Sequence, residues 1–236
     1  MPQCVFVLTG AGVSAESGLG TFRDKREGIW RRFDPMKLAT PEAFARDPAT
    51  VLAFYDARRR NLKSAEPNAA HFALARLERG LAERGGRLTL VTQNIDDLHE
   101  RAGSSGVVHM HGELFKARCE ACGSVHLWPD DLLTSHVCSE CGRRGRLRPH
   151  VVWFGEMPFH LDEIDRALRR ADLFVAIGTS GAVYPAAGFV AEARAYGVAT
   201  CEINLEAADN ANLFDEARYG PASETVPAWV EEMLRA

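Results

Sequence analysis

The chain has 236 residues, 46% of them hydrophobic and 25% charged, which is enough for one large globular domain with insertions. A formal net charge of −4 at pH 7 gives no reason to expect a nucleic acid or a membrane surface as the main partner. No apolar run approaches the roughly 20 residues of a membrane-spanning helix. The first apolar run, Met1–Leu8, is too short and uncharged for a secretory signal, so we expect a cytoplasmic protein.

Apolar runs that alternate with helical patterns predict a parallel sheet. The first run, Cys4–Leu8, leads into glycines and is typical of a buried strand followed by a turn and a helix. Because each run is largely apolar, helices should cover both faces of the sheet, as in a Rossmann-like α/β fold. The other expected strands are Arg87–Thr92, Leu173–Ile177 and Val198–Leu205, and the expected helices are His71–Glu83, Leu161–Arg170, Ala186–Tyr196 and Ala228–Leu234.

Two segments interrupt this alternation. Pro41–Lys63 is helical by pattern with proline punctuation, and residues 117–146 carry cysteines and little apolar content. After each of these segments the chain should return to the same sheet, so we expect the large domain to be discontinuous in sequence. The expected division is a Rossmann-like domain of residues 1–33, 84–116 and 147–236, a helical module of residues 34–83 and a metal-held module of residues 117–146.

Four of the six cysteines form two Cys-x-x-Cys pairs separated by 15 residues: Cys119, Cys122, Cys138 and Cys141. This spacing is typical of two zinc knuckles that supply four thiolates to one tetrahedral ion. No ligand position is left open, so one structural zinc per chain is expected. His126 and His136 are alternative ligands that the paired spacing disfavours. A solvated basic loop, or a contact with a substrate or partner, is expected from Arg143, Arg144, Arg146 and Arg148.

Residues 10–15 (GAGVSA) match the G-x-G-x-x-G/A fingerprint of dinucleotide-binding turns, in which backbone N–H groups and a helix N-terminus hold a pyrophosphate. The fingerprint also requires an acidic residue about 20 residues later, at the end of a second strand. Residues 30–35 (WRRFDP) do not fit a strand, so the ribose contact should come from residues 204–206 (NLE), with residues 178–180 (GTS) at another strand end. A purely structural glycine turn is the alternative.

Two further polar clusters follow. Residues 92–99 (TQNIDDLH) put the Asn94 amide and the Asp96 carboxylate two residues apart at one sheet edge, although both residue types are also common helix caps. Residues 109–113 (HMHGE) contain His111. A lone histidine is more often a packed or surface residue than a catalyst.

Together the motifs resemble the ordered motif set of the sirtuin family, close to its bacterial CobB-type branch. The resemblance implies NAD-dependent removal of acyl groups from protein lysines, which gives nicotinamide, 2′-O-acyl-ADP-ribose and free lysine. It also implies an NAD-binding Rossmann-like domain and a small domain made of a Cys4 zinc ribbon and a helical module. It extends from about Val5 to Trp229 and rests on residues 10–24 (GAGVSAESGLGTFRD), 92–103 (TQNIDDLHERAG), 109–114 (HMHGEL), 151–156 (VVWFGE), 178–187 (GTSGAVYPAA), 203–206 (INLE) and the paired Cys-x-x-Cys.

The resemblance implies a role for each matching residue. His111 would be the general base, because an imidazole can transfer protons near neutral pH, and Asn94 and Asp96 would complete the catalytic set. An apolar lysine tunnel, whose backbone edges pair with an extended peptide, would be formed by residues 152–155, while Glu156 would be structural. The acyl-lysine contacts would be Val152, Trp153, Phe154 and Gly155. NAD would contact Gly10, Ala11, Gly12, Ser14, Glu16, Phe22, Arg23, Trp30, Gln93, Asn94, Ile95, Asp96, Gly178, Thr179, Ser180, Asn204, Leu205, Glu206 and Ala222.

One departure concerns the cofactor-binding loop. Many relatives have Ile-Pro where this chain has Leu19-Gly20, so we expect a more mobile loop here. The Phe and Arg to which roles are assigned are both present.

Tyr55 and Arg58 are three residues apart and share one helix face, where a phenol and a guanidinium together can hold a carboxylate. Within the sirtuin family, this Tyr-x-x-Arg resembles the signature of enzymes that accept malonyl- and succinyl-lysine. The alternative is an ordinary amphipathic helix with a solvated Arg-rich side. Arg59 and Arg60 are expected to be solvated.

Two other classes of protein share some of these features. A hydride-transferring NAD oxidoreductase would also need the glycine turn, but the cysteines and His111 would have no role in such an enzyme. A zinc-ribbon nucleic-acid-binding module is weakened by the acidic net charge. An ADP-ribosyltransferase side activity stays open. The expected partners are acyl-lysine proteins or peptides, with no membrane or direct nucleic-acid partner, and we expect a monomer.

Overall fold

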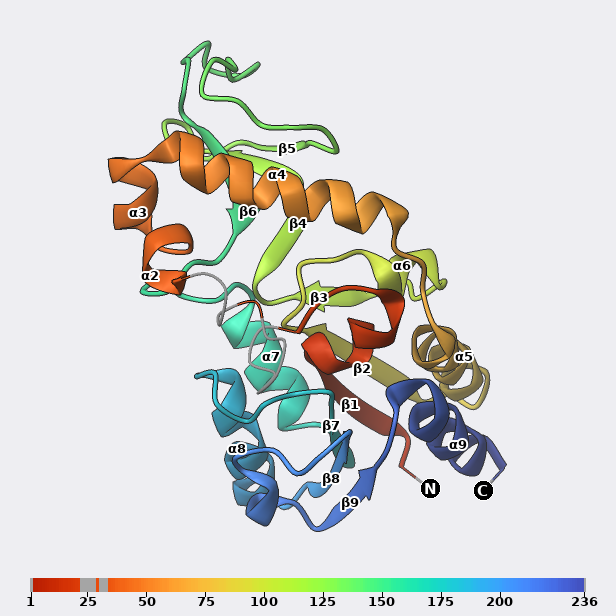
Figure 1. Ribbon diagram of the computed structural model, residues 1–236. Coiled ribbons are helices and arrows are strands. Elements are labelled where there is room, and N and C mark those ends of the chain that lie inside the picture. Colours follow the sequence, from red (N-terminus) through yellow and green to blue (C-terminus); the bar gives the residue numbers. More distant parts are fainter. Residues whose placement is uncertain (1, 22–28, 30–33, 236) are drawn as a thin grey trace. The chain divides into compact units, whose positions relative to one another are not determined.

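The computed structural model describes residues 2–21, 29 and 34–235, and its contacts divide the chain into two compact units (Figure 1). Unit 1 comprises Met1–Thr21, Glu66–Met110 and His160–Ala236, and unit 2 comprises Phe22–Ala65 and His111–Phe159. These boundaries differ from those of the expected modules. The helix Ala69–Glu83, expected in the helical module, belongs to unit 1, whereas residues 111–116 and 147–159 belong to unit 2.

A six-stranded sheet forms the centre of unit 1, and every neighbouring pair of its strands is parallel. The chain enters at β1, extends the sheet on one side through β2 and β3, and later extends the other side through β7, β8 and β9. The direction reverses between β1 and β7, and ligands bind at such switch points in open α/β sheets. In spatial order the strands are β3 (Val107–His109), β2 (Arg87–Thr92), β1 (Cys4–Thr9), β7 (Leu173–Ile177), β8 (Ala199–Asn204) and β9 (Glu216–Tyr219).

Helices cover both faces of this sheet, as predicted. Alternate residues of β1 point to opposite faces: Val5 and Val7 belong to one apolar core, and Phe6 and Leu8 belong to the other. The first core includes residues of α5 and α9, which pack side by side, and the second includes residues of α7 and α8 (Figure 1). The helical segments of unit 1 are η1 (Ala11–Ser17), α5 (Ala69–Glu83), α6 (Leu98–Arg101), α7 (Leu161–Leu168), η2 (Ala186–Gly188), α8 (Phe189–Ala195), η3 (Ala211–Leu213) and α9 (Ala222–Arg235).

Among the residues of unit 2 that the structure describes, the helices α2, α3 and α4 accompany a three-stranded antiparallel sheet of order β5-β4-β6. Each helix has a capping side chain, Asp34, Thr40 or Asp47, that accepts a backbone N–H, and a proline follows each cap. None of the helices in the described part of either unit is long and apolar enough to span a membrane. The elements of unit 2 are α2 (Pro35–Leu38), α3 (Pro41–Arg46), α4 (Pro48–Ser64), β4 (Gly112–Cys119), β5 (Val125–Leu127) and β6 (Leu147–Val151).

Candidate active site and metal centre

Two glycine turns meet at the switch point of the unit 1 sheet. The Gly10 N–H donates to the Ile177 carbonyl at 2.9 Å, and the Gly12 N–H donates to the Gly178 carbonyl at 2.9 Å. A Cβ at Gly10 would lie 2.7 Å from the Gly178 oxygen, and one at Gly12 would lie 2.7 Å from the Gly178 Cα, so both positions require glycine. The segment that follows, η1, is a short 3₁₀ helix. Because both glycine N–H groups are already bonded, a phosphate here would need other donors.

The Ser14 hydroxyl is the centre of a buried polar network beyond the ends of β1 and β2. Its oxygen lies 3.1 Å from Asn94 Nδ2, 3.2 Å from Asp96 Oδ2 and 3.3 Å from His71 Nε2. His71 Nδ1 accepts the Asn68 backbone N–H at 3.2 Å, so the proton of the neutral imidazole is on Nε2 and points at Ser14. Ser14 therefore accepts from His71 and Asn94 and donates its single proton to Asp96.

Burial changes the ionisation of this network. Desolvation raises the pKa of Asp96 to about 6, although hydrogen bonds from Leu98 N–H and Ser14 oppose the rise. Desolvation also lowers the pKa of His71 to about 4 and holds the pKa of His99 well below its ordinary value. Both imidazoles are therefore neutral near pH 7, and the Asp96 carboxyl can exchange a proton close to physiological pH.

Threonines at two strand ends support the same network. Thr9 and Thr92 are paired in register, and the Thr9 hydroxyl donates to Thr92 Oγ1 at 2.8 Å and lies 3.0 Å from His99 Nε2. The Asn94 N–H donates to Thr92 Oγ1 at 3.0 Å. The sequence interpretation assigned no role to either threonine or to His71. The available signal was a threonine closing each of two apolar strands, which become neighbours in a parallel sheet.

The ends of β7 and β8 bring together two residues predicted to contact NAD, Thr179 and Asn204. Asn204 Nδ2 donates to the Thr179 carbonyl at 2.7 Å and lies 3.3 Å from Glu202 Oε1. Asn204 Oδ1 accepts the Leu205 N–H at 3.0 Å. Both amide hydrogens are thus used inside the protein, so the Asn204 side chain can only accept a further hydrogen bond, for example from a hydroxyl group.

The four predicted cysteine ligands form one cluster in unit 2, and their ligand atoms all lie within 4.8 Å of one another. Cys119 Sγ is 3.7 Å from Cys141 Sγ, and Cys122 Sγ is 3.8 Å from Cys138 Sγ. Zn–S bonds of about 2.3 Å give a tetrahedron with edges of about 3.8 Å, so the cluster fits one zinc ion. His126 is not one of these four ligands, although its Nε2 lies 3.6 Å from Cys138 Sγ.

Tyr55 and Arg58 both lie on helix α4 but have different surroundings. Tyr55 is 5% exposed, and its hydroxyl oxygen accepts the indole N–H of Trp153 at 2.9 Å. Burial raises the pKa of Tyr55 to about 12 against the opposing charge of Arg58, so the phenol is protonated near pH 7. The Arg58 guanidinium lies over the Phe54 ring, 5.8 Å from its centroid.

The turn after β6 is held by an ion pair. Arg148 Nη1 and Nη2 donate to the two Glu156 carboxylate oxygens at 2.7 and 2.9 Å, and Glu156 Oε2 also accepts the Trp153 N–H at 2.8 Å. The expectation of a solvated Arg148 is wrong, because this side chain is buried and pairs with a residue that comes after β6. Trp153, predicted to line the lysine tunnel, is only 2% exposed.

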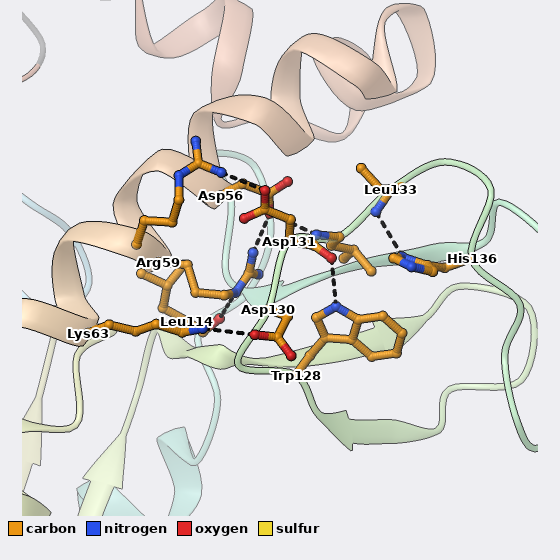
Figure 2. Close-up of polar contacts among 11 residues, drawn as sticks. Asp56, Arg59, Lys63, Leu114, Trp128, Asp130, Asp131, Leu133 and His136 are labelled. Atoms are coloured by element: carbon orange, nitrogen blue, oxygen red, sulfur yellow. Dashed lines mark hydrogen bonds and ion pairs between the residues drawn. The ribbon is translucent and has the colours of Figure 1, made fainter.

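Arg59 was also expected in solvent, and this expectation is wrong. Its exposed fraction is 0%, and it pairs with Asp56 and donates from Nε to the Leu114 carbonyl at 3.1 Å. The Asp56 carboxylate in turn accepts the Leu132 N–H at 3.0 Å. Figure 2 shows this link between α4 and the segment that carries Trp128, Asp130 and Asp131. Arg60 is exposed as expected and pairs with Asp131 at 2.6 Å.

The family model of the Sir2 family matches residues 10–185. The chain belongs to the Sir2 family. It is 65% identical over 232 residues to an NAD-dependent protein deacylase of Caulobacter vibrioides, covering 98% of this chain and 96% of that protein. Among solved structures it is similar to a Sir2 homolog–NAD complex, with 42% identity, a TM-score of 0.88 and coverage of 99% and 90%. It is also similar to a Sir2 complex with a p53 peptide and NAD⁺, with 28% identity, a TM-score of 0.82 and coverage of 100% and 95%.

The other predicted site residues of this Sir2 chain lie in several parts of the fold. Gln93 and Thr179 line one small pocket on the side of the sheet covered by α8. Glu16 accepts the Ser223 N–H at 3.0 Å at the start of α9, next to Ala222. His111 is partly buried, and its carbonyl accepts the Val152 N–H at 2.9 Å. Outside the described residues lie the predicted cofactor contacts Phe22, Arg23 and Trp30.

Proposed function

We propose that the chain is an NAD-dependent protein lysine deacylase that removes acetyl, succinyl and malonyl groups. Its products would be free lysine, nicotinamide and 2′-O-acyl-ADP-ribose. The proposal includes the expected division into an NAD-binding domain, a helical module and a zinc ribbon. Membership in the Sir2 family and the 65% identity to an NAD-dependent protein deacylase support the activity.

The observation that carries the proposal is the Ser14 network at the switch point. It holds the Asn94 amide and the Asp96 carboxyl beyond the ends of β1 and β2, with Ser14 Oγ within 3.2 Å of both. Asn94 Nδ2 donates to Ser14 Oγ and to the Gly10 carbonyl, so the amide oxygen is left to accept from a ligand. An amide oxygen that accepts and a carboxyl with a pKa near 6 suit a sugar with several hydroxyls and a polar carboxamide. A plain structural turn would not need two polar side chains that are each less than 10% exposed.

We assign His111 as the general base. NAD would supply the ribose that receives the acyl group and the nicotinamide that leaves. The His111 imidazole would take the proton from a ribose hydroxyl, the step for which enzymes most often use a histidine near neutral pH. The backbone supports this role, because the Val152 N–H bonds the His111 carbonyl and Gly112 continues the chain in a left-handed conformation with a φ of 82°. A Cβ at Gly112 would lie 2.1 Å from the His150 carbonyl, so the residue after the base must be glycine.

Tyr55 and Arg58 would select acyl groups that end in a carboxylate. Tyr55 remains a neutral hydrogen-bond donor because its pKa is about 12, and Arg58 supplies a positive charge on the same helix. A carboxylate that leaves water needs such partners. Acyl-lysine proteins or peptides are therefore the proposed substrates. We also propose that the protein is a cytoplasmic monomer with no direct nucleic-acid partner.

Product analysis tests the activity directly. The protein would be incubated with NAD and peptides of one sequence that carry acetyl-, succinyl- or malonyl-lysine, and the products would be identified by mass spectrometry. We expect acyl-ADP-ribose and nicotinamide in equal amounts. Conversion of NAD to NADH with unchanged peptides would instead favour the oxidoreductase, and an ADP-ribosylated peptide would reveal a transferase activity.

A further inference from the structure

The Tyr55 hydroxyl is a buried donor whose proton still needs an acceptor. Its oxygen accepts the Trp153 indole N–H at 2.9 Å, and the side chain is 5% exposed. Within residues 2–21, 29 and 34–235, no group accepts the hydroxyl's own proton. The indole satisfies the oxygen as an acceptor, so the hydroxyl proton is left to be donated to a ligand.

The indole N–H also fixes the direction of that proton. A phenol hydroxyl accepts and donates close to the plane of its ring, so a donor on one side leaves the other side for the proton. The pKa of Tyr55 is about 12, and the hydroxyl therefore keeps its proton throughout the physiological range. Tyr55 is thus a hydrogen-bond donor with one fixed direction.

Trp153 is itself held on several sides. Glu156 Oε2 accepts its backbone N–H at 2.8 Å, and the Arg148 guanidinium carbon lies 3.3 Å from the ring centroid. The Phe44 ring packs against the indole with 5.3 Å between centroids. At 2% exposure the indole has no room to rotate, so the position of its N–H is set by the fold.

Helix α4 is fixed next to Tyr55. Asp56 binds the Leu132 N–H and Arg59, and Arg59 binds the Leu114 carbonyl, which ties this turn of the helix to β4 and to the segment after β5. Both partners of the Tyr55–Trp153 bond are therefore anchored independently. A site held in this way is pre-organised, because no reorientation is needed when a ligand arrives.

The missing acceptor should be an anion. The Arg58 charge acts on the Tyr55 hydroxyl, and the Arg58 Nε and Nη1 atoms are buried. We propose that Trp153 is a positioning residue for acyl selectivity: its indole N–H orients the Tyr55 hydroxyl so that the hydroxyl proton is donated to the carboxylate of a succinyl or malonyl group. This inference rests on the proposed function and assigns to Trp153 a role apart from tunnel lining.

A double-mutant cycle tests the inference. We would measure kcat/KM for succinyl-lysine and butyryl-lysine peptides of one sequence in the wild type, Tyr55→Phe, Trp153→Phe and the double variant. The two acyl chains have equal carbon numbers, so their ratio isolates the carboxylate. Tyr55→Phe should lower the succinyl-to-butyryl ratio at least about 10-fold, as expected for a hydrogen bond to a charged group. Trp153→Phe should lower it about 3- to 10-fold, and the double variant no further than Tyr55→Phe.

Phe44→Leu is the matched control, because it changes packing on the same indole and leaves the N–H in place. It should not change the ratio. If Trp153→Phe does not fold, a benzothienyl amino acid at position 153 removes only the N–H and gives the same comparison. An unchanged ratio in this variant or in Trp153→Phe would overturn the positioning role, as would an equal drop in Phe44→Leu or a further drop in the double variant.

The wild-type values separate this failure from a failure of the proposed function. A protein that removes neither of these groups, and no acetyl group in the product analysis, refutes the deacylase activity itself. Equal treatment of the two groups refutes the acyl selectivity, and the positioning role with it. A clear succinyl preference that survives loss of the indole N–H overturns the positioning role alone.

Discussion

His71 and Asp96 contact the same hydroxyl group, that of Ser14, at 3.3 and 3.2 Å. Burial moves their ionisation in opposite directions: it lowers the pKa of His71 to about 4 and raises the pKa of Asp96 to about 6. The shift at His71 costs stability as the pH falls from about 6.5 towards 4, because only the unfolded chain then takes up the proton. The shift at Asp96 has the opposite sign, so the two contributions largely offset each other between about pH 4 and 6.

The first prediction concerns Asp96. Because its folded pKa lies above its unfolded value of ~3.9, its contribution to stability is fully present below about pH 4 and is lost as the pH rises through 6. Two pKa units at ~1.4 kcal/mol each give about 3 kcal/mol. The side chain of the Asp96→Asn variant does not titrate. The wild type should therefore lose about 3 kcal/mol of unfolding free energy relative to this variant between pH 4 and 8. Urea unfolding at several pH values measures this, and a pH-independent difference would contradict it.

The second prediction concerns the metal. Metal analysis should give about one zinc per chain, because the four thiolates close a tetrahedron. Cys119→Ala should lose the zinc and, with it, the fold of the ribbon, since metal-binding free energy is folding free energy in such modules. Cys4→Ala is the control, because Cys4 lies in β1 and should keep the metal. A metal-free Cys119→Ala protein with full activity and unchanged stability would refute the structural role.

Local patterns in the sequence predicted a large part of the fold. Four apolar runs became β1, β2, β7 and β8, because the burial of a parallel strand on both faces is visible in consecutive residues. The zinc ligands follow from spacing within two short loops. Helix α9 was predicted to begin at Ala228 but begins at Ala222. The prediction placed the helix start after Pro227 because proline usually interrupts a helix. So close to the helix start, however, a proline removes only one hydrogen bond, and the helix includes it.

The sequence could not predict charged side chains that are buried by distant partners. Arg59 and Arg148 are ordinary surface residues by type, and their burial depends on the Leu114 carbonyl and the Val151 carbonyl as well as on carboxylates. Backbone carbonyls carry no sequence signal, so a tertiary hydrogen bond to one cannot be predicted from residue types. His71 was missed for a different reason: it joins the Ser14 network from α5, whose amphipathic pattern gives no sign of a distant polar partner.

The third prediction follows from the buried pair in α4. Arg59→Met should lower the free energy of unfolding by about 3–5 kcal/mol, because it leaves the Asp56 carboxylate buried without its cation. Urea unfolding measures the loss. Arg60→Met, on the next residue, removes only an exposed pair with Asp131 and should leave stability nearly unchanged. Similar stabilities for the two variants would show that the Asp56–Arg59 pair does not hold the helix.

The fourth prediction concerns the general base. His111→Ala should lower kcat for deacylation by roughly 10²–10⁴-fold, the usual range for a general base, while NAD binding changes much less. Turnover and calorimetric NAD binding measure the two effects. His160→Ala is the control, because His160 lies exposed at the start of α7 beside Glu163. A His111→Ala variant with near-normal turnover would move the base elsewhere. His109 would then be the next candidate, since His99 is fully buried and bonded to Thr9.

The last prediction concerns the acyl group. A succinyl carboxylate that enters an apolar tunnel loses water and needs a charged partner, and a hydrogen bond involving a charge contributes roughly 1.5–3 kcal/mol. Arg58→Met should therefore reduce kcat/KM for succinyl-lysine by about 10- to 200-fold relative to acetyl-lysine, which has no carboxylate to lose. Parallel assays with the two peptides measure this ratio. Arg59→Met is unsuitable as the control because Arg59 is buried, so Arg60→Met takes that place and should leave both substrates unaffected. If Arg58→Met lowers both activities equally, Arg58 supports the fold or the cofactor site, and the prediction that it selects the acyl group is wrong.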